Sequence, residues 1–404
     1  MPRRIYYGWW IVAAVFFVLT VSSGFGFYNL SVYINVLAGA RGFSVSDVSV
    51  AVSLFFVVGG VTGMIVARLI DRYDVRWVMI GGAALGGAAL AAVGQATTLG
   101  QLYLLFVLFG IGNSAISIVT ATTLVTRWFP GPNRSVALSI ASTGLSAGGI
   151  VLTPLSARWL NEWGLEASMP WFGALFFVLV VPVVLWLIRG HPPQSTEPAE
   201  GGTSAGPAWR YADAVRSRFF LLVTLGYVLC MGSQVGGIAH LYNRAEQIAD
   251  YRAAALAVQA LTLMSILGRF FGGWLVTRIA IRPFALGNLV GQALGLTIIA
   301  TAQGPLQVVG GAALFGATVG NLLMLHPLWL ADAFGGYAYA RIFSLSNAVS
   351  VLGVAVGPAL LGLLFDMYDY RAAYLAGTGG SLLALVLMVG AGRAPLPAVR
   401  RAAG

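Results

Sequence analysis

Long apolar runs recur along this chain from one end to the other, and they constrain its fold more than any other feature. A run of about 20 apolar residues crosses a bilayer as a helix, whereas the strands of a membrane barrel alternate apolar and polar residues over segments of about 10. The sequence therefore predicts an all-α membrane protein of twelve transmembrane helices. The expected spans are 9–36, 46–68, 77–97, 100–126, 135–159, 169–188, 218–241, 252–276, 283–302, 306–330, 342–365 and 372–391.

The composition excludes a soluble globular protein. Of the 404 residues, 58% are hydrophobic and 9% are charged, whereas a soluble domain carries about 25% charged residues. The formal net charge is +10, but the arginines are scattered between the apolar runs, which is typical of membrane topology and not of nucleic-acid binding. The lone Cys230 cannot form an intrachain disulfide. The first apolar run lacks a small-residue cleavage site, so we interpret it as a permanent helix.

A linker divides the expected spans into two groups of six. The segment 189–217 is rich in Pro, Gly, Ser and Thr, a composition typical of flexible linkers. We therefore expect a six-helix bundle at 1–188, a cytoplasmic linker at 189–217 and a second six-helix bundle at 218–404. If the N-terminus is cytoplasmic, most arginines lie inside, as the positive-inside rule requires. The outside then holds Arg41, Arg158, Arg244, Arg252 and Arg371. This topology places both termini in the cytoplasm of a multi-pass protein of the cell inner membrane.

The two groups of spans show an internal repeat. The stretch ARLIDRYDVR at 67–76 aligns with GWLVTRIAIR at 273–282, and RSVALSIAS at 134–142 aligns with RIFSLSNAV at 341–349. Both pairs have nearly the same offset, and an even number of spans per repeat gives the repeats the same orientation. In parallel repeats of this kind, substrate sites lie between the halves near the middle of the membrane.

The stretch at 67–76 resembles the signature loop of the major facilitator superfamily, Gly-x-Leu-Ala-Asp-Arg-x-Gly-Arg-Arg. Asp71, Arg72 and Arg76 stand at matching positions, whereas Ala67 and Asp74 replace two glycines. The resemblance implies a loop that helps to gate the cytoplasmic side. It also implies that Asp71 pairs with an arginine across the entrance when the protein opens outward.

Further features resemble the monocarboxylate porters and their bacterial relatives, including oxalate/formate antiporters. The motif YYGWWIV at 6–12 begins the first span, and an arginine stands in the eighth. The fifth-span pattern of that branch, Trp-Phe-x-x-x-Arg-x-x-Ala, matches Trp128, Phe129, Arg134 and Ala137, with one additional residue before the arginine.

Arg269 is the charge that stands in the otherwise uncharged stretch LAVQALTLMSILGRFFGGWLV. A charged side chain at the centre of a membrane helix costs about 2.5–3.5 kcal/mol on insertion scales. The acidic residues all fall at span ends, in loops or in the linker, so we expect none at its depth. A structural role, including extension toward the cytoplasmic surface, stays open. We favour anion binding, because guanidinium matches a carboxylate with two parallel hydrogen bonds.

The resemblance also implies that an arginine of the eighth helix binds the substrate carboxylate. Some of those porters carry an aspartate one turn earlier for proton coupling, and here that position is Ser265. His240 and His326 then become the candidates for proton coupling, since histidine titrates near ~6.5; otherwise the substrate crosses with its own proton. Each histidine has an alternative role as a partner of a helix-end carbonyl. His191, in the linker, is expected to be solvated.

Other polar residues within the spans are candidates for substrate contact, although amides also join helices by hydrogen bonds. They are Tyr28, Asn29, Asn113, Gln234, Ser265, Asn321 and Asn347.

The sequence favours a secondary transporter that moves small organic anions by alternating access. Monocarboxylates such as lactate or pyruvate are preferred as substrates. Proton symport is one coupling mode that the sequence leaves open, beside antiport and uniport. An oxalate/formate-like antiporter, or drug or sugar efflux by the same fold, remains an alternative. An enzyme is disfavoured, since the chain has no HExxH motif and no His/Cys cluster with metal spacing. We expect no cofactor, no metal and no nucleic-acid partner, and a protein that functions as a monomer in the bilayer.

Overall fold

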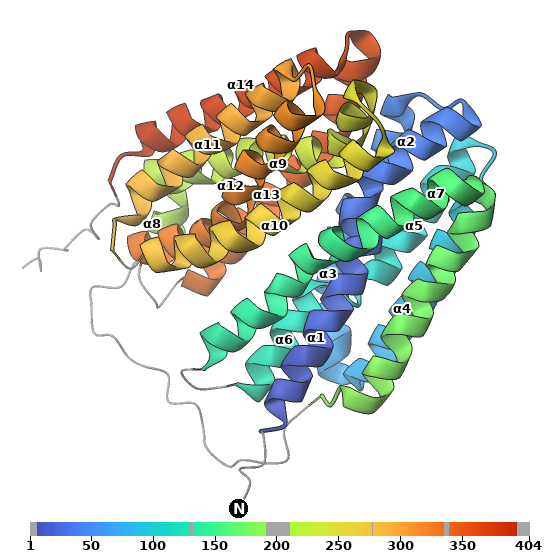
Figure 1. The fold of residues 1–404 in the computed structure, drawn as a ribbon. Helices are drawn as coiled ribbons and strands as arrows, with labels where there is room; N and C mark the ends of the chain where they lie inside the picture. The colour runs from blue at the N-terminus through green and yellow to red at the C-terminus, as the bar shows by residue number, and fades with distance from the viewer. Residues whose placement is uncertain (1–5, 130–132, 191–210, 277, 335–338, 394–404) are drawn as a thin grey trace, which may run out of the picture.

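The computed structural model describes all residues except 1–5, 130–132, 191–210, 277, 335–338 and 394–404. Within this described part, every regular element is helical (Figure 1). The elements are α1 Gly8–Ser23, η1 Gly24–Tyr28, α2 Asn29–Arg41, α3 Val45–Arg72, α4 Val75–Val93, α5 Leu99–Ser114, α6 Ile118–Trp128, α7 Arg134–Leu187, α8 Tyr211–Arg216, α9 Arg218–Ile248, α10 Tyr251–Leu275, α11 Ile281–Thr301, α12 Pro305–Phe334, α13 Tyr339–Met367 and α14 Tyr370–Ala391. The all-α fold class is confirmed.

Eleven helical runs of the described chain are long and apolar enough to cross a membrane. The expected count of twelve differs because the fifth and sixth spans form one continuous run, α7. Gly164 interrupts that run with φ 76° and ψ 175°, a left-handed conformation that glycine adopts at no steric cost. The chain reverses direction within α7 (Figure 1). The run therefore contains two passes, at 134–163 and 165–187.

Two other spans are interrupted near their middle. The first span changes from α1 to the π-helical turn η1 and then to α2, and such turns are frequent at functional sites. The fourth span breaks between α5 and α6, where Ser117 takes an extended conformation. Both irregular segments lie in the half of the chain that precedes the linker.

Short turns with side-chain caps join several neighbouring spans. The Ser44 side chain accepts from the backbone N–H of Asp47 at the start of α3. Asp250 and Asp369 cap α10 and α14 in the same way. Such caps stabilise a helix start by about 1 kcal/mol. They also fix the short connections α2–α3, α9–α10 and α13–α14.

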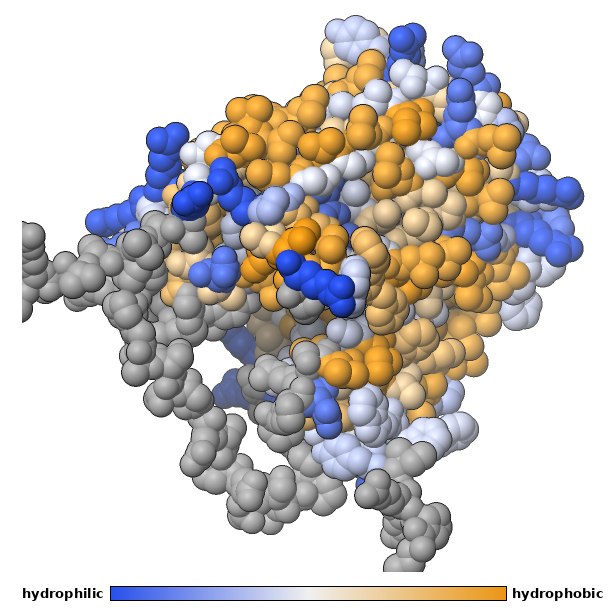
Figure 2. Space-filling view, turned by 60° about the vertical axis from the view of Figure 1, so that its left-hand side comes forward, coloured by the Kyte–Doolittle hydropathy of each residue, from blue (hydrophilic) through white to orange (hydrophobic). Residues whose placement is uncertain are grey.

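We call the end of the bundle at which α1 begins the terminal side, and the opposite end the distal side. The helix ends at the distal side carry the five arginines that were expected outside. The surface between the two sides exposes many large hydrophobic residues, including Trp186 and Phe270. Figure 2 shows hydrophobic side chains in a broad band on one face, with hydrophilic ones mainly at its margins. This pattern suits a bilayer.

Elements α1–α7 form the N-terminal half of the structure, and α8–α14 form the C-terminal half. The two halves lie close together at the distal side and diverge toward the terminal side (Figure 1). One buried hydrophobic cluster includes residues of both halves, among them Leu30, Phe109 and Ile238. A second cluster, with Tyr227 and Trp329, belongs to the C-terminal half alone. The exact division at 1–188 and 218–404 stays a prediction, and most of the expected linker lies outside the described residues.

Candidate functional site

Arg269 lies on α10, between Ser265 one turn earlier and Leu275, where the helix ends at the terminal side. Its side chain is half-buried. The α12 helix packs closely behind it, since a Cβ on Gly320 would lie 3.2 Å from the Arg269 Cβ. The absence of a side chain at Gly320 therefore lets α10 and α12 approach each other.

The Arg269 guanidinium reaches across to the N-terminal half. Its Nη1 donates to the backbone oxygen of Ser142 on α7, at 3.3 Å. None of the ion pairs in the described part of the chain includes Arg269. A guanidinium carries five N–H donors. No nitrogen of Arg269 is among the buried side-chain atoms that lack a hydrogen-bond partner in the described structure, so its free donors are accessible to solvent. Arg269 is therefore able to bind an anion.

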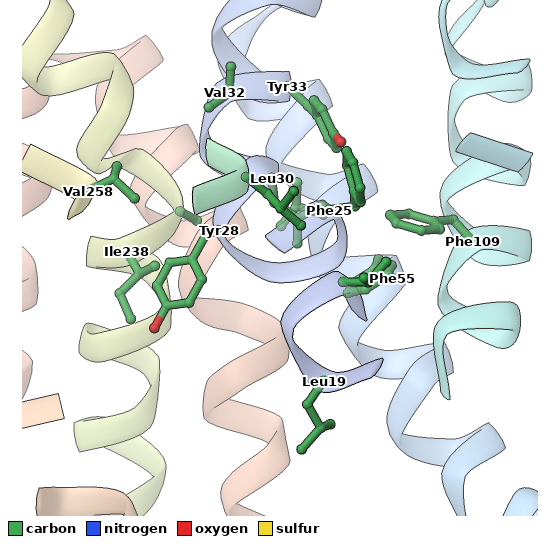
Figure 3. Close-up of a cluster of buried hydrophobic side chains, with 14 of the residues drawn as sticks. Leu19, Phe25, Tyr28, Leu30, Val32, Tyr33, Phe55, Phe109, Ile238 and Val258 are labelled. Carbon is green, nitrogen blue, oxygen red and sulfur yellow. The ribbon is translucent and has the colours of Figure 1, made fainter. Parts of the chain in front are cut away.

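Tyr28 faces the same region from η1. Its ring points away from Phe25, Tyr33 and Phe109 and toward Ile238 of the C-terminal half (Figure 3). The hydroxyl lies near the Ser146 side chain and close enough to Arg269 to interact with it electrostatically. Tyr28 and Arg269 thus lie near each other between the halves. That they bind one substrate stays a prediction.

Ser142 and Ser146 were not identified from the sequence. They stand one turn apart on α7 and contribute a carbonyl and a hydroxyl near Arg269 and Tyr28. Serine is common in membrane helices, so the sequence alone carried no signal that would single these two out.

Three of the candidate asparagines form hydrogen bonds between helices. Asn29 donates from Nδ2 to Ser156 Oγ at 2.7 Å, and Asn113 accepts from Ser22 Oγ at 2.8 Å. Asn321 donates to Asn288 Oδ1 at 3.1 Å. Among the hydrogen bonds of the described residues, none joins these side chains to Arg269.

The remaining polar candidates occupy different environments. Ser265 is buried between α10 and α12, and its hydroxyl has no hydrogen-bond partner in the described structure. Gln234 on α9 is buried, and its Oε1 likewise lacks a described partner. Asn347 on α13 is exposed, one turn toward the terminal side from Val351, which packs against Gly60 of α3. A role of these three in binding stays a prediction.

His326 lies inside the C-terminal half. Its Nε2 is 2.8 Å from Ser346 Oγ, and its ring stacks on Tyr227 with centroids 3.9 Å apart. Ser346 in turn lies 2.8 Å from Thr224 Oγ1. His326 is therefore held by partners from α9 and α13.

His240 lies at the distal contact between the halves. Its Nε2 is 2.9 Å from the Pro358 oxygen of α13 and 3.3 Å from Ser49 Oγ of α3. His191 falls outside the described residues.

The residues predicted to gate the entrance lie at the end of α3 and the start of α4, at the terminal side. Arg72 is exposed, and Arg76 forms an ion pair with Asp74 at 2.7 Å. Asp74 also accepts from the backbone N–H of Arg76 at the start of α4. The side chain of Asp71 lies outside the described residues, so its expected pairing across the entrance stays a prediction.

A cavity of about 230 Å³ lies apart from Arg269, between α9, α13 and α14. Its lining is almost wholly apolar and includes Gly232, Gly353, Gly357 and Gly377. It offers no charged group for an anion. Within the described residues, no group of three or more His, Cys, Asp or Glu side chains is placed to hold a metal ion.

The sequence model of the Major Facilitator Superfamily matches residues 16–305 and 245–403. The chain belongs to this superfamily. It is therefore a membrane transporter and not an enzyme.

Similar proteins support the same assignment. Monocarboxylate transporter 1 of Bos taurus is 23% identical, over 92% of this chain and 81% of that protein. A probable nitrate/nitrite transporter of Mycobacterium tuberculosis, NarK2, is 25% identical over 82% of this chain and 83% of its own length. Among solved structures, the nucleoside transporter NupG superposes with a TM-score of 0.77 at 12% identity, covering 95% of this chain and 100% of that one. The expected superfamily and transporter class are confirmed.

Proposed function

We propose that this transporter moves small organic anions, with monocarboxylates such as lactate or pyruvate as the preferred substrates. The observation that carries the proposal is Arg269, a half-buried guanidinium between the halves without an ion pair in the described structure. A charge at this depth needs a counter-charge or water. A carboxylate satisfies it with two parallel hydrogen bonds, and the Tyr28 hydroxyl nearby provides a further donor.

The geometry of this proposal fits alternating access. Arg269 belongs to α10, whereas Ser142 and Tyr28 belong to the N-terminal half. A substrate bound between them therefore contacts both halves, and a rocking motion of one half against the other changes its access. With the terminal side in the cytoplasm of an inner-membrane protein, the divergence seen in Figure 1 corresponds to a state open to the inside.

The names of two relatives support a small anionic substrate. One is named a monocarboxylate transporter and another a probable nitrate/nitrite transporter. Lactate, pyruvate and nitrate share a compact anionic head of oxygen atoms, which is the geometry that guanidinium recognises. The alternatives of oxalate/formate-like antiport and of drug or sugar efflux differ in what Arg269 does, so they are separable by binding.

Thermal unfolding of the purified protein tests the proposal, because a ligand that binds only the folded state raises its stability. The panel contains lactate, pyruvate, formate, oxalate, nitrate and an uncharged sugar. We expect the short monocarboxylates to raise the melting temperature of the wild type and not of Arg269→Gln.

Arg252→Gln is the matched control, since Arg252 is an exposed arginine at the other end of the same helix. It should respond like the wild type. If nitrate or oxalate alone stabilises the wild type, that anion and not a monocarboxylate is the substrate. An equal response of Arg269→Gln, or a response to the sugar only, would refute the role of Arg269.

A further inference from the structure

Polar contacts close the distal side between the two halves. Asn35 of α2 donates to Glu246 of α9, and the Ser46 backbone N–H of α3 donates to Asp366 of α13 at 2.8 Å. The backbone N–H of Ala359 donates to Ser53 Oγ at 3.2 Å. We call this set, together with Ser49 and His240, the distal seam. The seam must separate when the transporter opens to the distal side.

His240 is the fully buried titratable side chain of the distal seam. Its Nε2 faces the Pro358 oxygen and Ser49 Oγ, and the Ser49 hydroxyl already donates to the Val45 oxygen at 2.6 Å. Nε2 must therefore carry a hydrogen and donate to these oxygens. Nδ1 is 3.5 Å from the Tyr370 hydroxyl of α14, which donates to it in the neutral ring.

The closed seam does not accommodate a second proton on the His240 ring. Such a proton would make Nδ1 a donor as well, so that the Tyr370 hydroxyl would have to turn its hydrogen away. It would also place a charged ring in a position closed to water, where a charge is unfavourable unless it is paired. The closed seam therefore holds the neutral imidazole.

The charges around His240 do not replace such a pair. Asp366, at the end of α13, acts on His240 electrostatically but accepts a hydrogen bond from Ser46. On α9 itself, Glu246 is bonded to Asn35 of α2, and Arg244 donates to backbone oxygens at the end of α11. The facing group from α3 is the Ser49 hydroxyl, and the facing group from α14 is the Tyr370 hydroxyl. On the α10 side, Tyr251 and Asp250 act electrostatically on Tyr242.

His326 has no comparable position. Its contacts, with Ser346, Tyr227 and Phe343, all come from the C-terminal half. Separation of the two halves leaves these contacts unchanged. Of the two histidines in the described chain, only His240 has a partner in the other half. It loses this partner, the Ser49 hydroxyl, when the distal seam opens, whereas Pro358 and Tyr370 move with it.

We infer that His240 is a proton-binding site that controls the distal seam: the seam closes on the neutral ring, and a proton taken up from the distal side holds it open. The proton returns to the side from which it came before the seam closes. His240 thus acts as a pH-dependent gate and not as a carrier of the transported proton. This inference rests on the proposed alternating-access function, but it does not depend on which anion is moved.

Distances between labels across the seam test the inference without substrate. Cysteines replace Ala40 and Tyr368, two exposed distal positions in opposite halves, in a Cys230→Ala background. Spin labels are attached to both cysteines, and pulsed electron–electron double resonance measures the distance between them at pH 8 and at pH 5. We expect the population with the longer distance to rise at least twofold at pH 5 in the parent, and to stay unchanged in His240→Gln.

Two control variants separate His240 from the acidic residues of the seam. Asp366→Asn and Glu246→Gln keep a hydrogen-bond acceptor but cannot titrate, so both should retain the shift. Loss of the shift in either of them, or its survival in His240→Gln, would overturn the inference. If His240→Gln does not fold, the test rests on the two acid variants and on His326→Gln. All three should keep the pH-dependent shift in distance, and loss of the shift in any of them would overturn the inference. Carboxylate binding by Arg269 is scored separately, so failure of one proposal leaves the other standing.

Discussion

The guanidinium of Arg269 on α10 donates to the backbone oxygen of Ser142 on α7, at 3.3 Å. Among the hydrogen bonds that join the two halves in the described part of the chain, this one lies nearest the terminal side. Its acceptor is a neutral carbonyl, and its donor–acceptor distance is slightly longer than the usual range of about 2.7–3.2 Å. The contact is therefore weak, and a carboxylate that entered from the terminal side would replace it at a gain.

Replacement of Arg269 by lysine should weaken substrate binding less than replacement by glutamine. Lysine keeps the charge but loses the planar pair of donors. A charged hydrogen bond contributes about 1.5–3 kcal/mol, so we expect about tenfold weaker binding for Arg269→Lys and about a hundredfold for Arg269→Gln. Titration calorimetry with the best monocarboxylate measures both. Equal affinities for the three proteins would contradict the model of bidentate binding.

Removal of the Tyr28 hydroxyl should affect substrate more than stability. Tyr28→Phe keeps the ring that packs against Gly149 of α7 but removes the hydroxyl near Arg269 and Ser146. A neutral hydrogen bond contributes about 0.5–1.5 kcal/mol, so affinity should fall by about twofold to tenfold. Uptake into proteoliposomes and the melting temperature are measured together. A large fall in melting temperature with unchanged affinity would show that the hydroxyl is structural.

A methyl group at Gly320 should separate α10 from α12. The added Cβ of Gly320→Ala would meet the backbone oxygen of Ser265, which cannot move without the helix. Overpacking of this kind typically costs about 1–3 kcal/mol. Gly287→Ala on α11 is the control, since a Cβ there meets nothing within 4 Å. Thermal unfolding should show a lower melting temperature for the first variant and no decrease for the second.

Alanine substitution should lower the stability of the protein at Asn29 but not at Asn347. Asn29 is buried and bonded to Ser156, so its loss leaves a buried hydroxyl without that partner, at a cost of about 1–3 kcal/mol. Asn347 is exposed, so Asn347→Ala should leave stability unchanged. Any loss of uptake in Asn347→Ala would then report substrate contact. Destabilisation of Asn347→Ala and none of Asn29→Ala would contradict these assignments.

The sequence predicted the helices well because each apolar run is long and its ends carry arginines or capping residues. It missed the continuity of α7, because one glycine at position 164 reverses the chain and nothing in an apolar pattern marks a reversal without a loop. It also missed the interruptions at η1 and Ser117, which depend on packing against neighbouring spans.

The site was predictable only in part. Arg269 stood out since a charge in an apolar run is rare, and Tyr28 followed from its place in the first span. The amides gave a weaker signal, because Asn29, Asn113 and Asn321 have the same composition whether they join helices or face a substrate. Which hydroxyls of α7 reach Arg269 depends on how two distant helices are rotated, and a single sequence does not contain that angle.

The two-residue connection between α9 and α10 has a mechanical consequence. Ala249 and Asp250 alone separate these helices, and Asp250 caps α10. So short and fixed a turn transmits displacement without absorbing it. His240 stands on α9 and Arg269 on α10, the two helices of this hairpin. Separation of the distal seam, which moves α9, therefore also moves α10 and with it the Arg269 guanidinium.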